Sequence, residues 1–212
     1  MSHWDEALLT ARLKAGDEAA FRELIEALHG SLLGLARTFL KDTASAEEMV
    51  QETWLAVLQG LDRFEGRSSL KTWIFSILAN KARTRAVRDG REVLFSEMAS
   101  AEETDEPAVD PSRFKASGFW NEPPRPWDDD TPERLLANAE MMQHLKRALE
   151  ALPATQRVVV VLRDMEGLSA EEACNILNVS ETNQRVLLHR GRSRLRRMLE
   201  DALSAAGKKD TL

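Results

Sequence analysis

The sequence predicts an all-α fold, with two small helical domains joined by an acidic, proline-rich linker. In both halves of the chain, apolar residues recur every three to four positions, the spacing of a helix that buries one face. No segment keeps the alternating pattern of a half-buried strand, and the run at 158–161 lies inside a longer helical period. Six of the seven prolines fall between residues 107 and 132, a density that prevents regular helix there.

Length and composition agree with this division. A chain of 212 residues has room for two small domains, since domains commonly hold about 100 to 150 residues. The chain is 43% hydrophobic and 30% charged, which excludes wholly disordered, collagen-like and disulfide-scaffold proteins. We expect domains at 1–90 and 134–205, a linker at 91–133 and a tail at 206–212.

Cysteine usage and the first residues predict the compartment. A single cysteine cannot form an internal disulfide, which fits a reducing compartment. No apolar run reaches the roughly 18 residues of a membrane-spanning helix. Acidic residues stand near the start, where a signal peptide needs a basic and then an apolar segment. We therefore expect a soluble, cytoplasmic protein without membrane insertion.

In the first domain, a helix is expected after Asp17, whose carboxylate suits the N-cap position. Its apolar residues continue at helical spacing beyond Gly30 to Phe39. A second helix is expected to open with a capping box, in which Ser45 is the N-cap and Glu48 the third residue. The face that this helix would bury is formed by Val50, Trp54, Val57 and Leu58.

A polar loop at 62–69 and a third helix complete the first domain. The helix is expected from about Leu70 to Arg88. The second domain opens with a helix that starts near Pro132. Pro153 suits the first turn of the next helix, which would end near Met165.

A helix-turn-helix pattern follows in the second domain. Ser169 and Glu172 form a capping box that opens a short helix, and a long basic helix is expected at about 181–199. Asn178 occupies the turn where such motifs usually have glycine, and asparagine tolerates the left-handed conformation that the turn requires. The side chains expected to face inward are Ala173, Ile176, Val179 and Val186.

The net charge of −6 hides a strong segregation of charge. Residues 89–134 carry 13 acidic and 5 basic side chains, a balance of −8, so the rest of the chain sums to +2. Gly66–Arg88 and Thr182–Arg197 each contain six basic residues and no acid. Phosphate neutralisation depends on local charge, so these two stretches predict a nucleic-acid partner for both domains.

The sequence offers no convincing catalytic or metal-binding constellation. Its four histidines are far apart, and it has neither a phosphate loop nor a metal-ligand spacing. Cys174 is more simply a packed thiol, and Asp128–Asp130 is a charge run among prolines rather than a metal site. We expect no enzymatic activity, no cofactor, no metal and no small-molecule substrate.

Two elements are candidate DNA-binding surfaces. The first turn of the 181–199 helix offers short or bidentate polar groups suited to base edges, and its later arginines suit phosphates. In the 70–88 helix, Trp73 and Phe75 accompany Lys71, and aromatic side chains beside cations are typical of single-stranded DNA binding. The alternatives are a solvated basic face for the first element and ordinary core packing for Trp73.

The order of these motifs resembles a sigma-70 family factor of the small extracytoplasmic-function type. The resemblance covers about residues 15–88 and 132–200. It rests on the helix Ser45–Trp54, the loop Arg63–Ser69, the helix from Lys71, the segment Leu152–Arg157 and the helix-turn-helix. Each motif is loose alone, but the five in this order are specific.

The resemblance implies promoter recognition as a subunit of bacterial RNA polymerase. The core-binding helix of the family matches Gln51 and Glu52, with Glu48 and Leu55 as weaker candidates on the same face. The family's melting element, which flips one non-template base of the minus 10 element, maps onto the 62–69 loop and the helix after it. The minus 10 candidates are Phe64, Arg67, Ser68, Lys71, Trp73, Asn80, Lys81, Arg83 and Arg85.

The helix-turn-helix would read the minus 35 element as duplex DNA. Its candidates are Ser180, Glu181, Thr182, Asn183, Gln184, Arg185, His189, Arg190 and Arg192. Most members of the family are held inactive by an anti-sigma factor. The resemblance therefore implies three partners: core RNA polymerase, promoter DNA and an anti-sigma factor.

Two other functions are weighed against this one. A helix-turn-helix repressor or activator that acts outside the polymerase would explain the second domain, but not Trp73 and the basic helix around it. An all-helical adaptor would leave both basic stretches unexplained. For the aromatic linker segment Trp120–Trp127, docking on protein, threading the RNA channel of the polymerase and packing against the second domain all remain open.

Overall fold

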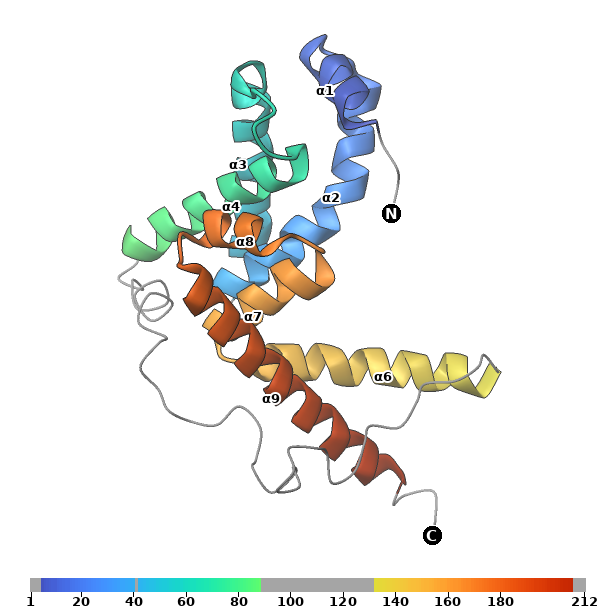
Figure 1. Ribbon diagram of the computed structural model, residues 1–212. Helices are drawn as coiled ribbons and strands as arrows, with labels where there is room; N and C mark the ends of the chain where they lie inside the picture. Colours follow the sequence, from blue (N-terminus) through green and yellow to red (C-terminus); the bar gives the residue numbers. More distant parts are fainter. Residues whose placement is uncertain (1–4, 41, 89–131, 208–212) are drawn as a thin grey trace.

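The computed structural model describes residues 5–40, 42–88 and 132–207. Every regular element in these ranges is a helix, which confirms the all-α prediction (Figure 1). The N-terminal unit comprises α1 (Glu6–Lys14), α2 (Glu18–Phe39), α3 (Thr43–Gly60), the 3-10 turn η1 (Leu61–Arg63) and α4 (Leu70–Arg88). The C-terminal unit comprises α6 (Pro132–Ala151), α7 (Ala154–Val160), the π-helical segment η4 (Val161–Met165), α8 (Ala170–Leu177) and α9 (Glu181–Gly207). The predicted linker, up to residue 131, lies outside the described residues, and Trp120–Trp127 with it.

In the N-terminal unit, α2, α3 and α4 pack against one another around an apolar core. Helix α2 begins as predicted: Asp17 is its N-cap, and the carboxylate accepts hydrogen bonds from the amides of Ala19 and Ala20. Burial of one stripe of each helix supplies most of the stability of such a bundle. The largest fully buried side chains of this core are Leu24, Leu32, Leu35, Met49, Ile74, Phe75 and Leu78.

Helix α3 differs from its prediction at both ends. Its N-cap is Asp42, whose carboxylate accepts a hydrogen bond from the Ser45 amide at 2.7 Å. The prediction of Ser45 as N-cap was wrong. The helix begins upstream of Ser45, and the Ser45 amide is one of the first-turn amides that the Asp42 carboxylate caps. Near the other end, the predicted burial of Leu58 was also wrong, since its side chain is 52% exposed. Val57 beside it is buried, as predicted.

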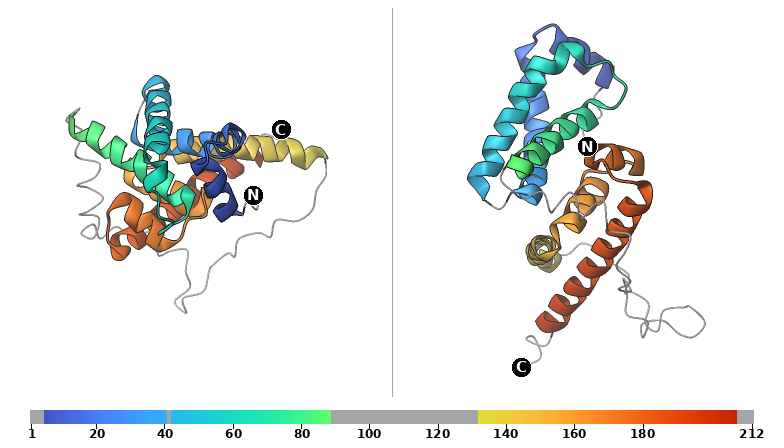
Figure 2. Two further views of the ribbon diagram at one scale, coloured as in Figure 1. Left: turned by 90° about the horizontal axis from the view of Figure 1, so that it is seen from above. Right: turned by 90° about the vertical axis from the view of Figure 1, so that its left-hand side faces the viewer.

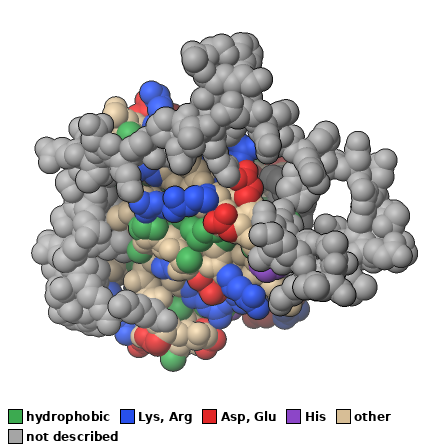
Figure 3. Space-filling model, turned by 90° about the horizontal axis from the view of Figure 1, so that it is seen from below, with side chains coloured by type: hydrophobic (Ala, Val, Ile, Leu, Met, Phe, Trp, Pro, Cys, Tyr) green, Lys and Arg blue, Asp and Glu red, His purple; other side chains and the backbone are tan. Residues whose placement is uncertain are grey.

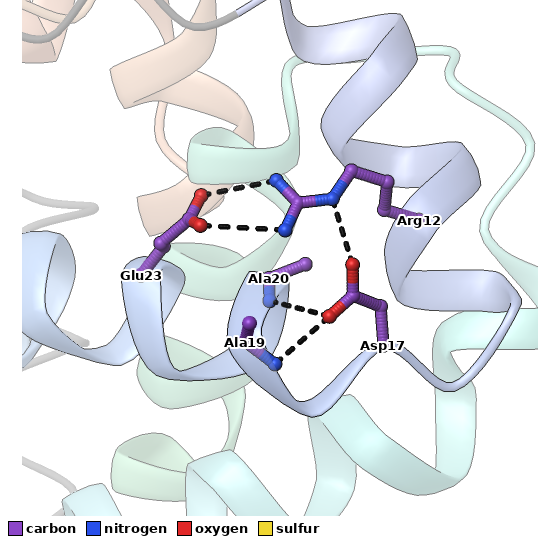
Figure 4. A network of polar contacts seen from close by, with 5 residues as sticks. All are labelled: Arg12, Asp17, Ala19, Ala20 and Glu23. Atoms are coloured by element: carbon purple, nitrogen blue, oxygen red, sulfur yellow. Dashed lines mark hydrogen bonds and ion pairs between the residues drawn. The ribbon is translucent and has the colours of Figure 1, made fainter.

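Helix α1 has no counterpart in the sequence prediction. It is capped by Asp5 and buries only Leu9 and Leu13. Arg12 joins it to α2, because its guanidinium lies 2.8 Å from Asp17 and 3.2 Å from Glu23 (Figure 4). The hydrogen bond from Arg12 holds the pKa of Asp17 below its usual value.

The C-terminal unit contains the predicted helix-turn-helix. The capping box is confirmed: the Ser169 hydroxyl accepts from the Glu172 amide at 3.1 Å, and the Glu172 carboxylate accepts from the Ser169 amide at 2.8 Å. Asn178 adopts the predicted left-handed conformation, with φ 55° and ψ 50°. Helix α9 runs further than expected, to Gly207. It crosses α7 closely at Gly191.

The two units pack against each other. Helix α8 lies on α4, and α7 and η4 lie against α2. Figure 2 shows this arrangement from a second side, with the helix-turn-helix beside the N-terminal bundle and α9 extending away from it. The faces predicted to bind the two promoter elements therefore belong to units that contact each other.

Candidate protein-binding and nucleic-acid interfaces

Helix α3 presents an exposed stripe to solvent. The side chains predicted to bind core polymerase recur on it at helical spacing, because α3 buries the opposite face through Val50 and Val57. Glu48, Gln51, Glu52 and Leu55 are all exposed, and Leu55 is 58% exposed. We define the α3 stripe as Glu48, Gln51, Glu52, Leu55 and Leu58.

Sequence reasoning missed Leu58, which extends the α3 stripe by one turn. It follows Leu55 by three residues, so the two side chains lie on the same face. The two exposed leucines form a small apolar patch on α3, which could be buried by a partner protein. Its three-residue spacing from Leu55 could have predicted that Leu58 is exposed. The prediction instead grouped Leu58 with the apolar residues Trp54 and Val57 of the buried face.

Two cations of α4 reach the α3 stripe. Arg85 contacts Glu48 at 2.7 Å, and Lys81 contacts Glu52 at 3.3 Å. Both were predicted to bind minus 10 DNA. An ion pair near the surface contributes about 0 to 1 kcal/mol, so a DNA phosphate could replace Glu52 as the partner of Lys81 at little cost in free energy.

The loop before α4 rests on a pair of aromatic rings. Phe64 is 7% exposed, and its ring centroid lies 5.0 Å from that of Trp73. The prediction that Phe64 contacts DNA does not fit this placement, because packing on Trp73 fills the space beside its ring. Trp73 is half-buried, and its indole lies so close to α3 that a Cβ atom added at Gly60 would be 3.3 Å from it. Phe75 is fully buried and belongs to the core.

Between Phe64 and α4 the loop is exposed. Gly66 has φ 72°, the left-handed conformation that suits glycine, and it turns the chain there. Arg67 and Ser68 are exposed, and Arg67 pairs with Glu65 inside the loop. Ser69 then opens α4, since its hydroxyl accepts from the Thr72 amide at 3.0 Å. The loop therefore holds Arg67 and Ser68 outside the core, a few residues after the ring of Phe64.

The first turns of α4 face the C-terminal unit. The Lys71 ammonium lies 2.8 Å from the Glu166 carboxylate, and the Thr72 hydroxyl donates to Glu172 at 2.6 Å. This hydrogen bond, with the one from the Ser169 amide, lowers the pKa of Glu172. Further along α4, Arg83 donates to the Leu177 carbonyl at 2.7 Å.

Arg83 also donates to Asn80 at 3.1 Å, and Asn80 is exposed. Burial against the C-terminal unit lowers the pKa of Arg83. Of the predicted minus 10 candidates, Lys71 and Arg83 are therefore engaged by the helix-turn-helix and the segment before it. Arg67, Ser68 and Asn80 are open to solvent.

Helix α9 presents a polar stripe along its first three turns. Its members recur at intervals of three and four residues, and Arg185 pairs with Glu181 at 2.9 Å while Arg192 pairs with Asp164 at 2.9 Å. The Ser180 hydroxyl accepts from the Asn183 amide at 3.2 Å and so caps the helix. The exposed predicted residues are Ser180, Glu181, Thr182, Arg185, His189 and Arg192, and Arg190 is half-buried.

Asn183 and Gln184 do not lie on this polar stripe. Their residues are 4% and 3% exposed, so the prediction that they face a DNA groove disagrees with the structure. Leu187 and Leu188 follow them by one helical turn and are also buried. These leucines set the rotation of α9, and they turn Asn183 and Gln184 inward. Val186, expected to face inward, is only half-buried for the same reason.

Cations and carboxylates lie close together on one face of the described surface. On the described part of the face seen in Figure 3, lysine and arginine side chains lie beside aspartate and glutamate. Within the described ranges no group of three or more potential metal ligands comes together. No helix in the same ranges is long and apolar enough to cross a membrane.

Two family models match the chain. The model of sigma-70 region 2 matches residues 24–92, and that of sigma-70 region 4 matches residues 142–195. The first match includes the α3 stripe, the loop and α4, and the second includes the helix-turn-helix. Helix α1 precedes both.

Curated relatives match over most of their length. The ECF RNA polymerase sigma-E factor of Salmonella typhimurium is 27% identical over 187 residues, which cover 88% of this chain and 90% of the relative. The corresponding sigma-E factor of Escherichia coli K12 shows the same identity and coverage. The RNA polymerase sigma-H factor of Pseudomonas aeruginosa is 26% identical over 198 residues, 93% of this chain and 95% of the relative.

Two solved structures share the fold. CnrH, in complex with the cytosolic domain of CnrY, has a TM-score of 0.53 and 21% identity, with 92% of this chain and 97% of that chain covered. The sigma factor RpoE of Bartonella quintana, in complex with the anti-sigma factor NepR, has a TM-score of 0.54 and 23% identity, with 85% and 96% covered.

Proposed function

The chain belongs to the sigma-70 family as an ECF-type sigma factor, and from this premise we propose how its surfaces direct transcription initiation. As a subunit of RNA polymerase, it would select a promoter and open its minus 10 element. It would work by binding alone, in the cytoplasm, without catalysing a reaction. The N-terminal domain, 1–90, would bind the polymerase and the minus 10 element, and the C-terminal domain, 134–205, would bind the minus 35 element.

The α3 stripe binds core polymerase. Its two leucines supply apolar area to bury, and its carboxylates and Gln51 surround them with polar groups, as in the core and rim of a protein interface. Leu58 joins the predicted residues because it lies on the same exposed face.

The loop and α4 bind the minus 10 element. Taking a base out of the stack costs a few kcal/mol, and stacking and hydrogen bonds in the protein offset that cost by about 1 to 3 kcal/mol per base. Arg67, Ser68 and Asn80 are the exposed polar groups that support this role, and Trp73 backs the loop. Lys71, Lys81, Arg83 and Arg85 would neutralise phosphates once their present partners are exchanged.

Helix α9 reads the minus 35 element in the major groove. Thr182, Arg185 and His189 share its exposed stripe and suit base edges, whereas Arg190 and Arg192 suit phosphates. Two weak DNA contacts on one polymerase-bound chain reinforce each other through effective concentration. Neither domain therefore needs high affinity alone.

An anti-sigma factor is the proposed regulator. Both solved structures compared above are complexes, one with the anti-sigma factor NepR and one with the cytosolic domain of CnrY. A partner of this kind would act by occluding the α3 stripe or the DNA-binding helices.

The observation that carries the proposal is the division of surfaces. One unit holds an exposed stripe with leucines and, beside it, a loop backed by aromatic rings, while the other holds an exposed recognition-type helix. A repressor needs only the last of these.

The test is run-off transcription from a genomic fragment library, with core polymerase freed of other sigma factors. We expect transcripts with discrete starts only when the chain is added. If the chain instead bound specific duplex sites without the polymerase and produced no transcripts, a repressor or activator would be the better explanation.

A further inference from the structure

We propose that helix α1 is a clamp that holds the minus 10 loop in its binding conformation, with Glu6 and Lys14 as its positioning residues. The proposal rests on the function proposed above and adds residues that neither the sequence motifs nor the family matches include, since region 2 is matched only from residue 24.

Lys14 fixes the start of the loop. Its ammonium donates a hydrogen bond of 2.7 Å to the carbonyl of Phe64, fifty residues away in sequence. Phe64 is the residue at which η1 ends and the loop begins, and its ring is held by Trp73. The bond from Lys14 holds the backbone at the same point.

Glu6 fixes the end of the loop. Its carboxylate accepts a hydrogen bond from the amide of Leu70, the first residue of α4. The first amides of a helix have no partner within the helix, and the N-terminal end of the helix dipole favours a negative charge. Glu6 therefore caps α4 from another element, while Ser69 caps it locally.

The ion pair inside the loop, between Glu65 and Arg67, does not reach either end of it. The Glu65–Arg67 pair is exposed and flanks Gly66, which has no Cβ and therefore changes backbone conformation readily when it is unrestrained. The two anchors from α1 lie on either side of this exposed segment. They restrict the loop at the points where it leaves the rigid elements.

Helix α1 is itself held in place by α2. Leu9 and Leu13 are buried, and Arg12 bridges Asp17 and Glu23 with the geometry drawn in Figure 4. A short helix is marginal alone, so these contacts give it the rigidity that a clamp requires. Arg12 faces α2, whereas Glu6 and Lys14 reach the loop.

The clamp matters because a pre-ordered loop binds without losing freedom on binding. Capture of one flipped base depends on polar groups that must be placed correctly while the base is out of the stack. A loop released at Phe64 and Leu70 would keep Arg67 and Ser68 but present them in many arrangements. The expected defect is slower capture of the base, with polymerase binding unchanged.

The experiment uses the full chain in a holoenzyme, on a promoter fragment selected in the run-off library. The probe is 2-aminopurine placed within the minus 10 non-template strand, whose fluorescence rises when the base leaves the stack. Glu6→Ala and Lys14→Met each remove one anchor. Glu6→Gln keeps an acceptor and Lys14→Arg keeps a donor, so these are the conservative variants.

The controls make the same chemical changes away from the loop. Glu18→Ala alters an exposed carboxylate in the first turn of α2, and Lys146→Met alters an exposed ammonium on α6. The midpoint of thermal unfolding and the affinity for core polymerase are measured for every variant. These two readouts report the fold and the α3 stripe.

We expect Glu6→Ala and Lys14→Met to slow the fluorescence rise by about tenfold, the effect of losing one hydrogen bond to a charged group. Glu6→Gln and Lys14→Arg should recover most of the rate, and the controls should match the wild-type chain. Wild-type rates in Glu6→Ala and Lys14→Met would overturn the clamp. Equal slowing in the controls, or no recovery in the conservative variants, would overturn it too. If the wild-type holoenzyme itself flips no base, the proposed function fails first.

Discussion

At the scale of single residues, Gly191 sets how closely α9 approaches α7. A Cβ atom added there would lie 2.7 Å from Cγ2 of Val160, a side chain that is 2% exposed. Val160 is packed within the buried face of α7, so an added methyl group would force its side chain or the helix to shift. Glycine is therefore required for this crossing rather than for a turn.

Gly191→Ala should destabilise the protein. Overpacking at a buried crossing costs about 1 to 3 kcal/mol, and the better helix propensity of alanine offsets up to about 1 kcal/mol of it. The control is Gly34→Ala, since Gly34 is an exposed position of α2 where the added Cβ contacts nothing within 4 Å. Urea unfolding should show a loss for the first variant and a small gain for the second. A gain for both would mean that the crossing relaxes freely.

Single residues also show how far sequence reasoning reaches. The caps at Asp17 and Ser169 and the left-handed Asn178 were predicted correctly, because each depends on neighbours in sequence. Asn183 and Gln184 were misplaced, because their burial depends on the rotation of α9 about its axis. That rotation is set by packing across the unit, which local polarity does not encode.

At the scale of elements, α3 combines a buried face and a binding face within one helix. The buried positions were predictable from apolar spacing, but Leu58 carries the same residue type on the exposed side. The only sequence signal for its exposure was the three-residue spacing from Leu55, and the buried Val57 beside it gave the stronger, opposite signal. Exposure in the folded structure is what assigns it to the α3 stripe.

Leu58→Asp should weaken binding to core polymerase by about tenfold, because burial of one leucine contributes about 1.5 to 3 kcal/mol and its exposed state contributes little to folding. The matched control is Met142→Asp, at a position of α6 that is 61% exposed. The dissociation constant of each purified variant is measured with core polymerase immobilised on a surface. If both variants bound as tightly as the wild-type chain, the interface would not extend to the end of α3.

Helix α1 illustrates the limit of prediction for elements. It is nine residues long and buries only two side chains, so its apolar pattern is too short to stand out. Its proposed role depends on hydrogen bonds to Phe64 and Leu70, which lie fifty and sixty-four residues away from their partners in α1. Contacts of that kind are visible only in the folded chain.

At the scale of the whole molecule, the two units lie closed against each other. Lys71 and Arg83 are proposed to meet DNA phosphates, yet both contact the C-terminal unit. Helix α8 covers the start of α4 at the Thr72–Glu172 hydrogen bond. We expect the units to separate when the chain occupies the polymerase and promoter.

Loosening this contact should open the free protein. The double variant Lys71→Met with Thr72→Val removes the contacts of Lys71 with Glu166 and of Thr72 with Glu172, at about 1 kcal/mol per hydrogen bond. The radius of gyration from small-angle X-ray scattering should therefore increase. Acid should act in the same direction. The hydrogen bond from Thr72 lowers the pKa of Glu172, so it stabilises the closed form at pH values above the usual pKa of glutamate. That stabilisation is lost as the pH falls through the lowered pKa of Glu172. Lys81→Met, which removes a contact within the N-terminal unit, is the control. An unchanged radius in the double variant would show that apolar packing alone holds the units together.

The overall organisation was predictable from sequence patterns. Apolar residues have helical spacing in two blocks, a proline-rich segment separates the blocks, and each block has a stretch rich in cations. The closed packing of the units was not, since its contacts join residues about a hundred positions apart, such as Thr72 and Glu172. Linear patterns indicate which surfaces exist, and the folded structure indicates which of them face each other.

The most direct test of the central claim is permanganate reactivity of thymines on a selected duplex promoter. We predict that thymines around the minus 10 element become reactive only when core polymerase and the chain are both present, without a nucleotide cofactor. Unreactive thymines with both present, or specific protection of the promoter by the chain alone, would contradict the account.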